Sequence, residues 1–202
     1  MKPITTVQLI QPRASGLFII LILLGSFMMP ACTSSPSRED LNRLIRQGVI
    51  GKTFYLRHAL YSNRRIHSTL NLHAGHLYPI NTPVMVLDLN KKVIRLKIGG
   101  GDILLIRNDM EFSRQSLGAI FERTLSDKPV SLSGLSPLEL EYIRHGRVAK
   151  GMRKRAVIMA YGYPPYFRTE SLESDRWVYW QDRRQILHLI FRDGILREIM
   201  HR

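Results

Sequence analysis

The segment from Gly151 to Ile199 constrains the fold more than any other part of the sequence. It opens with residues that predict a short helix, Arg153 to Tyr161. Within it, Val157 and Ala160 recur at the spacing of one helix face. Gly162 follows and is expected to take the left-handed conformation at the helix C-terminus, and the two prolines after Tyr163 cannot continue a helix.

Three strands are expected after this helix, at Arg176 to Gln181, Gln185 to Phe191 and Ile195 to Met200. Each run is rich in the β-branched and aromatic residues that favour strands. Asp193-Gly194 separates the last two runs and favours a type I′ turn, because both central residues of that turn have positive φ. The segment therefore predicts a helix followed by a three-stranded antiparallel meander.

Nine residues of this segment carry a glycine-methionine start, a G-x-P stop, a W-x-Y strand and an F-x-D-G hairpin: Gly151, Met152, Val157, Gly162, Pro164, Trp177, Tyr179, Phe191 and Gly194. In order and spacing they resemble the SmpA/OmlA family of small outer-membrane lipoproteins, which includes the E component of the β-barrel assembly machine. The resemblance implies a binding or scaffold role in outer-membrane protein assembly, with envelope proteins as partners. It also implies partner contacts at the loop after the G-x-P stop and at the W-x-Y strand, which makes Tyr166, Phe167 and Trp177 the candidate partner-binding residues.

Residues 1–31 have the features of a bacterial export signal, namely two basic residues and an apolar run from Gly16 to Met29. That run is shorter than the about twenty apolar residues that a membrane-spanning helix needs. Cys32 is the only cysteine of the chain and stands where a lipobox places the acylated residue. Thr33, in place of aspartate, implies sorting to the outer membrane. The alternative is an uncleaved N-terminal anchor with an incidental cysteine.

The rest of the chain divides into four predicted segments: a flexible tether at 32–47, a β-rich module at 48–108, a helical connector at 109–135, and the SmpA/OmlA-like domain at 136–202. The tether is rich in Ser and charged residues. Strands are expected at Pro83 to Leu89, Val93 to Ile98 and Ile103 to Ile106, and their size and spacing loosely resemble bacterial SH3 modules.

Two helices are expected between the β module and the C-terminal segment. Ser113 to Leu125 is amphipathic. Ser136 and Glu139 form a capping-box pattern, and the helix that they start ends at Gly146. The predicted fold class is therefore α+β, with a small SH3-like β module followed by a two-helix, three-stranded antiparallel meander domain.

The sequence is strongly basic, with 30 Lys and Arg residues, 16 Asp and Glu residues, a net charge of +14 and a pI near 10.4. Nucleic acid is the usual partner of such a chain, but an exported protein would meet phosphatidylglycerol, lipid A and peptidoglycan instead. The candidate anionic-surface residues form one dense run: Arg147, Lys150, Arg153, Lys154 and Arg155. A second basic pair follows at Arg183-Arg184.

The sequence gives no pattern typical of a catalytic, metal or cofactor site. Gly51-Lys52-Thr53 lacks the first glycine of a phosphate-binding loop. His58, His67, His73 and His76 lack the four-ligand spacing of structural zinc, and we interpret them as surface-loop residues. We therefore expect a non-catalytic, lipid-anchored scaffold protein. A binder of anionic envelope polymers or lipids is the first alternative, and a cell-wall-acting enzyme is the second.

Overall fold

The computed structural model describes residues 36–182 and 184–202, so the predicted signal peptide and Cys32 lie outside the described residues. The fold is α+β, as the sequence predicts. The helices are α1 (Pro36–Arg46), α2 (Met110–Ser113), α3 (Leu117–Thr124), α4 (Pro137–Arg144) and α5 (Lys154–Tyr161). None of the helices within the described ranges has the length and apolar character to cross a membrane.

Most of the strands fall in two runs, one between α1 and α2 and one after α5, and Gly99–Gly101 forms a single 3-10 turn, η1. Those before α3 are β1 (Thr53–Leu56), β2 (Leu60–Ser62), β3 (Ile66–Ser68), β4 (His76–Tyr78), β5 (Pro83–Leu89), β6 (Val93–Ile98) and β7 (Ile103–Arg107). Those after it are β8 (Leu125–Ser126), β9 (Arg176–Trp180), β10 (Ile186–Arg192) and β11 (Ile195–His201).

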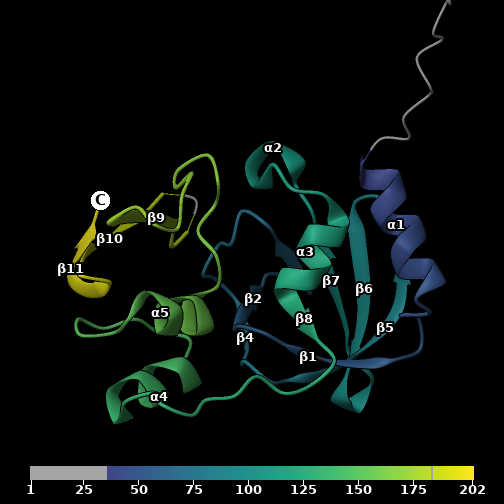
Figure 1. Cartoon of the computed structure of the whole chain (residues 1–202), viewed down its shortest axis with the longest axis horizontal. Coiled ribbons are helices and arrows are strands. Elements are labelled where there is room, and N and C mark those ends of the chain that lie inside the picture. The colour runs from purple at the N-terminus through teal and green to yellow at the C-terminus, as the bar shows by residue number, and fades with distance from the viewer. Residues whose placement is uncertain (1–35, 183) are drawn as a thin grey trace, which may run out of the picture. The chain divides into compact units, whose positions relative to one another are not determined.

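A six-stranded sheet in the order β3-β7-β6-β5-β1-β8 carries the first hydrophobic core (Figure 1). The strands β5, β6 and β7 are antiparallel neighbours, whereas β3 pairs with β7 in parallel. Buried and exposed residues alternate along β5, where Val84 and Val86 are buried and Met85 is exposed. This alternation is the period-two pattern of a sheet with one face covered.

Helices α1 and α3 pack together and share the first core with this sheet (Figure 1). Leu44 of α1 is only 1% exposed, and Ile120 of α3 is also buried. The prediction of a flexible tether at 32–47 is therefore wrong over Pro36–Arg46, because an amphipathic face of that segment is buried. The predicted connector at 109–135 also belongs largely to the first core, because α3 and β8 bury their apolar residues there.

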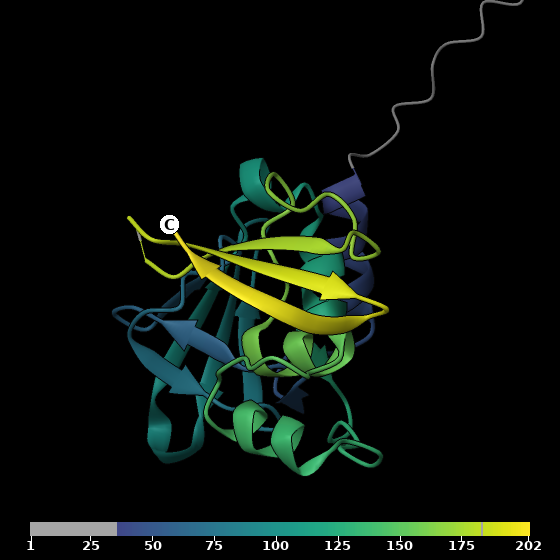
Figure 2. The same ribbon diagram turned by 90° about the vertical axis from the view of Figure 1, so that its left-hand side faces the viewer.

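The second core lies between helices α4 and α5 and an antiparallel sheet in the order β11-β10-β9 (Figure 2). The observed bounds of α5 and of these three strands agree with the predicted ones to within one residue at every end. Asp193 and Gly194 have φ values of 52° and 71°, as the predicted type I′ turn requires. A register shift between Ile190 and Phe191 marks a β-bulge.

The glycine-methionine start and the W-x-Y strand both form hydrogen bonds within this unit. The amide of Gly151 donates to the carbonyl of Leu196 on β11, at 2.8 Å. The hydroxyl of Tyr179 donates to the carbonyl of Gly162, at 2.9 Å. Gly162 has a φ of 73° but a ψ of −171°, so the prediction of a left-handed helical cap is wrong, although glycine is still favoured there.

Residues 58–81 connect the two cores through backbone hydrogen bonds. The strands β2 and β4 form a small sheet of their own in this segment. The amide of Ala59 donates to the carbonyl of Met159 in α5, at 2.9 Å. The hydroxyl of Tyr61 donates to the carbonyl of Gly146, at 2.7 Å. Ile80 is buried with the second core, although it belongs to the predicted β module.

Candidate functional site

Two of the histidines in this connecting segment are almost completely buried. His58 is 4% exposed and His67 is 5% exposed. Burial lowers the pKa of His58 to about 3, and it also lowers the pKa of His67. Each Nδ1 lies within 3.0 Å of a main-chain carbonyl oxygen. The interpretation of the histidines as surface-loop residues is therefore wrong here, and of the four only His76 is exposed.

His73 stacks on one aromatic ring, and each of its two ring nitrogens lies close to a main-chain carbonyl. Its imidazole is stacked on the ring of Tyr161, with centroids 3.4 Å apart and planes 13° apart. Its Nε2 lies 2.7 Å from the carbonyl oxygen of Tyr161, and its Nδ1 lies 3.3 Å from that of Trp180. Burial lowers the pKa of His73 to about 4, although both carbonyls oppose this shift. A neutral ring has one N–H, which we assign to Nε2 at the shorter distance.

Asn71 closes the end of α5 from a position 90 residues earlier in the chain. Its Nδ2 donates to the carbonyl oxygens of Tyr161 and Tyr163, at 2.8 and 2.9 Å. The last carbonyls of a helix lack partners within the helix, and Asn71 and His73 together supply hydrogen bonds to the carbonyl of Tyr161. Asn71 has a φ of 53°, a conformation that asparagine tolerates better than most residues.

A cavity of about 40 Å³ lies beside these residues, lined in part by His58, His67, Asn71 and Tyr163. The guanidinium of Arg123 also lines it and lies 3.5 Å from the centroid of the Tyr163 ring. Burial lowers the pKa of Arg123. Since one water molecule occupies about 30 Å³ of liquid, the cavity has room for about one water molecule. The buried histidines therefore lie where the two cores meet, beside a small cavity.

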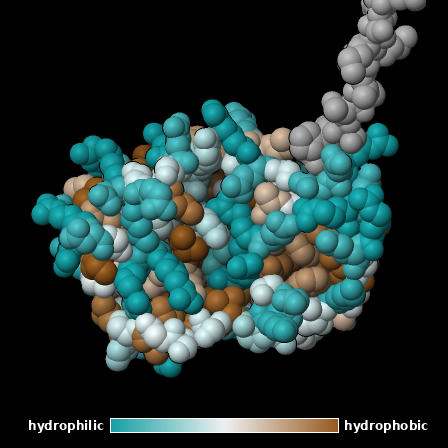
Figure 3. Space-filling view, in the orientation of Figure 1, coloured by the Kyte–Doolittle hydropathy of each residue, from teal (hydrophilic) through white to brown (hydrophobic). Residues whose placement is uncertain are grey.

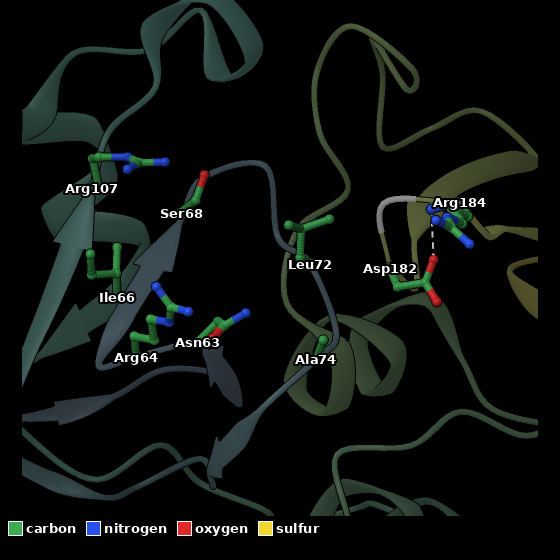
Figure 4. A pocket seen from close by; sticks show the side chains of 9 residues that line it. All are labelled: Asn63, Arg64, Ile66, Ser68, Leu72, Ala74, Arg107, Asp182 and Arg184. Carbon is green, nitrogen blue, oxygen red and sulfur yellow. Dashed lines mark hydrogen bonds between the residues drawn. The ribbon is translucent and has the colours of Figure 1, made fainter.

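A much larger groove, of about 900 Å³, lies between the sheet of the first core and the loop after β9 (Figure 4). We call it the arginine groove; its described lining residues are Asn63, Arg64, Ile66, Ser68, Leu72, Ala74, Arg107, Asp182 and Arg184. Arg64 and Arg107 lie on one side, Arg184 lies on the other, and Leu72 lies between them (Figure 4). Sequence reasoning noted the basic pair at 183–184 but missed Arg64 and Arg107, which come from separate elements of the first sheet.

Two of the five residues in the predicted basic run at 147–155 are paired with carboxylates of the chain. Arg153 forms a salt bridge with the buried Glu139, with Nη2 2.6 Å from Oε2. The side chain of Lys154 is only 20% exposed, and its Nζ lies 3.5 Å from Oδ1 of Asp175. Arg155 is exposed and donates to the carbonyl of Ser131.

The remaining members of that run, Arg147 and Lys150, are exposed. Neither is part of a salt bridge found among residues 36–182 and 184–202. The charge that this run presents to solvent is therefore smaller than the sequence indicates.

Tyr166 and Phe167 are half-buried and keep part of each ring at the surface. The ring of Phe167 lies 5.2 Å from that of Phe112, between centroids. The guanidinium of Arg114 lies 5.4 Å from the centroid of Tyr166, and that of Arg168 lies 5.3 Å from the centroid of Phe167. We call these five residues the ring surface. It contains two of the three residues that the sequence predicts as partner-binding.

The third predicted residue, Trp177, is wrongly assigned to a partner surface. Its side chain is fully buried, at 0% exposure, and its ring packs on Phe191 with centroids 4.7 Å apart. Alternation along a strand separates two faces, but here Val178 is buried as well, so both faces of β9 are covered at this point. A partner has no access to Trp177 in this conformation.

Large hydrophobic side chains also reach the surface in several elements: Ile45, Ile50, Met85, Met110, Leu138, Leu172 and Met200. Figure 3 shows hydrophilic residues over much of the viewed face, with hydrophobic residues gathered in smaller areas. Isolated exposed hydrophobics are normal on soluble proteins. The ring surface and the arginine groove are more specific candidates, because each combines charged and apolar groups in a defined arrangement.

Comparison with models of protein families, with curated proteins and with solved structures gave no match for this chain. Among the residues that the structure describes, no group of three or more His, Cys, Asp or Glu side chains is placed to hold a metal ion.

Proposed function

We propose that the chain is a non-catalytic lipoprotein of the outer membrane that faces the periplasm and acts as a binding or scaffold subunit in envelope protein assembly. The membrane anchor would be an acylated Cys32, and this part of the proposal rests on the sequence. The assembly role rests on the resemblance to the SmpA/OmlA family. The structural observation that supports binding best is the ring surface.

The ring surface has the chemistry that protein interfaces favour. Aromatic residues and arginine are enriched at the centres of such interfaces, where a few of them contribute most of the binding free energy. Arg114 and Arg168 lie over the rings of Tyr166 and Phe167, which restrains these side chains before a partner arrives. The loop that carries both rings follows α5, where the family resemblance expects the partner.

The state of the buried histidines supports a non-catalytic role. A histidine that serves as a general base needs a pKa near the working pH and access to a substrate. Instead, burial lowers the pKa of His58 to about 3 and of His73 to about 4. Their ring nitrogens are directed at main-chain carbonyls. These contacts fit a role in joining the two cores.

The finer fold assignment belongs to the same proposal. The order α4, α5, β9, β10, β11 supports an SmpA/OmlA-like domain from residue 136 onward. The short antiparallel strands β5, β6 and β7 support an SH3-like module. The parallel pairing of β3 with β7 and the addition of β8 would be elaborations of that module.

Site-specific photo-cross-linking tests the binding surface. The full-length chain would carry benzoylphenylalanine in place of Phe167 in intact cells, with Met200 as the control position, since it is also partly exposed but lies on β11. We expect position 167 to cross-link to an outer-membrane assembly protein, identified by mass spectrometry, and position 200 to give no such product. Equal cross-linking from both positions would contradict the proposed surface.

Palmitate labelling tests the anchor independently. The full-length chain and its Cys32→Ala variant would be compared by metabolic labelling and membrane fractionation. We expect label and outer-membrane recovery for the first and neither for the second. An unlabelled full-length chain would exclude the lipoprotein assignment and leave the ring surface to be tested on its own.

Binding of anionic envelope polymers through the 147–155 run is the weaker alternative. Arg153 is already paired with the buried Glu139, and Lys154 lies close to the exposed Asp175. Salt-sensitive sedimentation with peptidoglycan, lost on Arg147→Gln with Lys150→Gln, would favour it over the ring surface.

A further inference from the structure

The arginine groove brings three guanidinium groups to two opposite walls. Arg64 follows β2 and Arg107 ends β7, whereas Arg184 belongs to the loop after β9 (Figure 4). These positions are far apart in the sequence, so only the fold brings them to one groove. Guanidinium groups bind phosphate and carboxylate through paired hydrogen bonds, which makes arginine the preferred residue for such anions.

Two carboxylates reduce the positive charge of the groove, because Asp182 lines it and Asp109 is paired with Arg107, but three arginines against two acids still leave it net positive. The carboxylate of Asp182 accepts hydrogen bonds from the amides of Arg184 and Gln185, at 2.6 and 2.8 Å. These bonds turn Asp182 toward its own loop. Arg107 contacts Asp109 through Nε, at 3.0 Å.

The floor of the groove is aliphatic. Leu72 and Ala74 lie between the two walls, and Ile66 lies beside Arg64 and Arg107 (Figure 4). No aromatic side chain is among the described residues around the groove. Bases are usually bound by stacking on aromatic side chains, so this floor is poorly suited to a nucleotide. A hydrocarbon chain needs only apolar contact, which the floor offers. The volume of about 900 Å³ also lies in the range of about 300–1,000 Å³ that is typical of ligand sites.

We propose that the arginine groove binds an anionic amphiphile, with its phosphate or carboxylate between the arginines of the two walls and its hydrocarbon part on the aliphatic floor. Inorganic phosphate alone would leave that floor uncovered. This site is separate from the ring surface and from the 147–155 run. It does not depend on the proposed assembly role, because a chain that binds no envelope protein could still bind such a ligand.

Photo-cross-linking with lipids of matched chain length tests this site. The purified full-length chain, in a non-ionic detergent, would receive photoactivatable phosphatidylglycerol or photoactivatable phosphatidylcholine. We expect phosphatidylglycerol to label peptides that contain Ile66 to Ala74 several-fold more than phosphatidylcholine does. The double variant Arg64→Gln, Arg184→Gln should reduce this label about tenfold, which corresponds to about 1.4 kcal/mol.

The matched control is the double variant Arg95→Gln, Arg197→Gln, which removes the same charge from two exposed arginines outside the groove. We expect this control to keep the label, and both double variants to keep the thermal midpoint of the parent chain. Equal labelling by the two lipids would overturn the proposal, as would equal loss in the two double variants. If inorganic phosphate reduced the labelling and the two lipids labelled the chain equally, the groove would bind simple anions only. That result would overturn the proposed amphiphilic ligand.

Discussion

Arg153 closes over the buried carboxylate of Glu139, with Nη2 2.6 Å from Oε2 and Nε 2.9 Å from Oε1. Glu139 also accepts hydrogen bonds from the backbone amides of Ser136 and Arg153. The Arg153 side chain is the main cause of the low pKa of Glu139, which is about 2. One carboxylate therefore joins the start of α4 to the start of α5.

Arg153→Ala should lower the free energy of unfolding by about 2–3 kcal/mol, because it leaves a charged group that is 2% exposed without its main partner. Arg155→Ala is the matched control, and it should change stability by less than about 0.5 kcal/mol, since that side chain is exposed. Urea denaturation of both variants measures the difference. Equal losses of stability in the two variants would show that burial of the Glu139 carboxylate does not depend on Arg153.

Stability should fall as the pH drops below about 6.5, because the buried histidines stay neutral in the fold but become protonated when the chain unfolds. The folded pKa is about 3 for His58 and about 4 for His73. Their contribution is therefore complete above the unfolded pKa and is lost as the pH falls toward these values. Each should add a slope of up to about 1.4 kcal/mol per pH unit between about pH 6 and 4.

Chemical denaturation from pH 4.5 to 8 measures this slope. His73→Gln removes one titrating group and should reduce the slope, whereas His76→Gln alters an exposed histidine and should leave it unchanged. A flat profile in the parent chain would contradict burial of the histidines. Glu139 adds a separate loss at lower pH, below its usual pKa of 4.5 and toward about 2.

Gly162→Ala should destabilise the fold by about 2–3 kcal/mol, because φ is 73° and an added Cβ would lie 2.9 Å from Nδ2 of Asn71. Gly99→Ala is the control, since an added Cβ there meets no atom within 4 Å. Thermal unfolding of the two variants distinguishes them. If Gly162→Ala left the thermal midpoint unchanged, Asn71 would be able to move away from the added Cβ at little cost in free energy.

Trp177 and Phe167 should respond differently to truncation, although the sequence assigns both to one surface. Trp177→Ala should lower the free energy of unfolding by about 3–5 kcal/mol, because the side chain is fully buried. Phe167→Ala should change stability much less and should weaken cross-linking from benzoylphenylalanine placed at the neighbouring Tyr166 of the ring surface. If Trp177→Ala kept the stability of the parent chain, the second core would have to be packed differently.

Local signals predicted the parts of this fold that depend on neighbouring residues. The capping box of Ser136 and Glu139 and the turn at Asp193-Gly194 are both present as expected. Each is defined within about four residues, so the physical cause is contained in the sequence window. The strands β5, β6 and β7 were predicted for the same reason.

Features that depend on distant residues were missed. The segment that forms α1 has the polar composition of a tether, and only contact with α3 and the first sheet explains the burial of Leu44. The burial of His58 and the parallel pairing of β3 with β7 also require partners far along the chain. The arginine groove has the same origin, because no sequence window contains both Arg64 and Arg184.

The bonds from Asn71 to the carbonyls of Tyr161 and Tyr163 limit how the C-terminal segment could be moved into another protein. A C-terminal fragment that began at residue 136 would lose Asn71 at the end of α5 and also Ile80, which is buried in the second core. Transfer of that fragment to another protein would have to include residues 58–81 or supply a substitute for them. The two halves of the chain therefore depend on each other at this contact, and a substitution on one side restricts which substitutions the other side can accept.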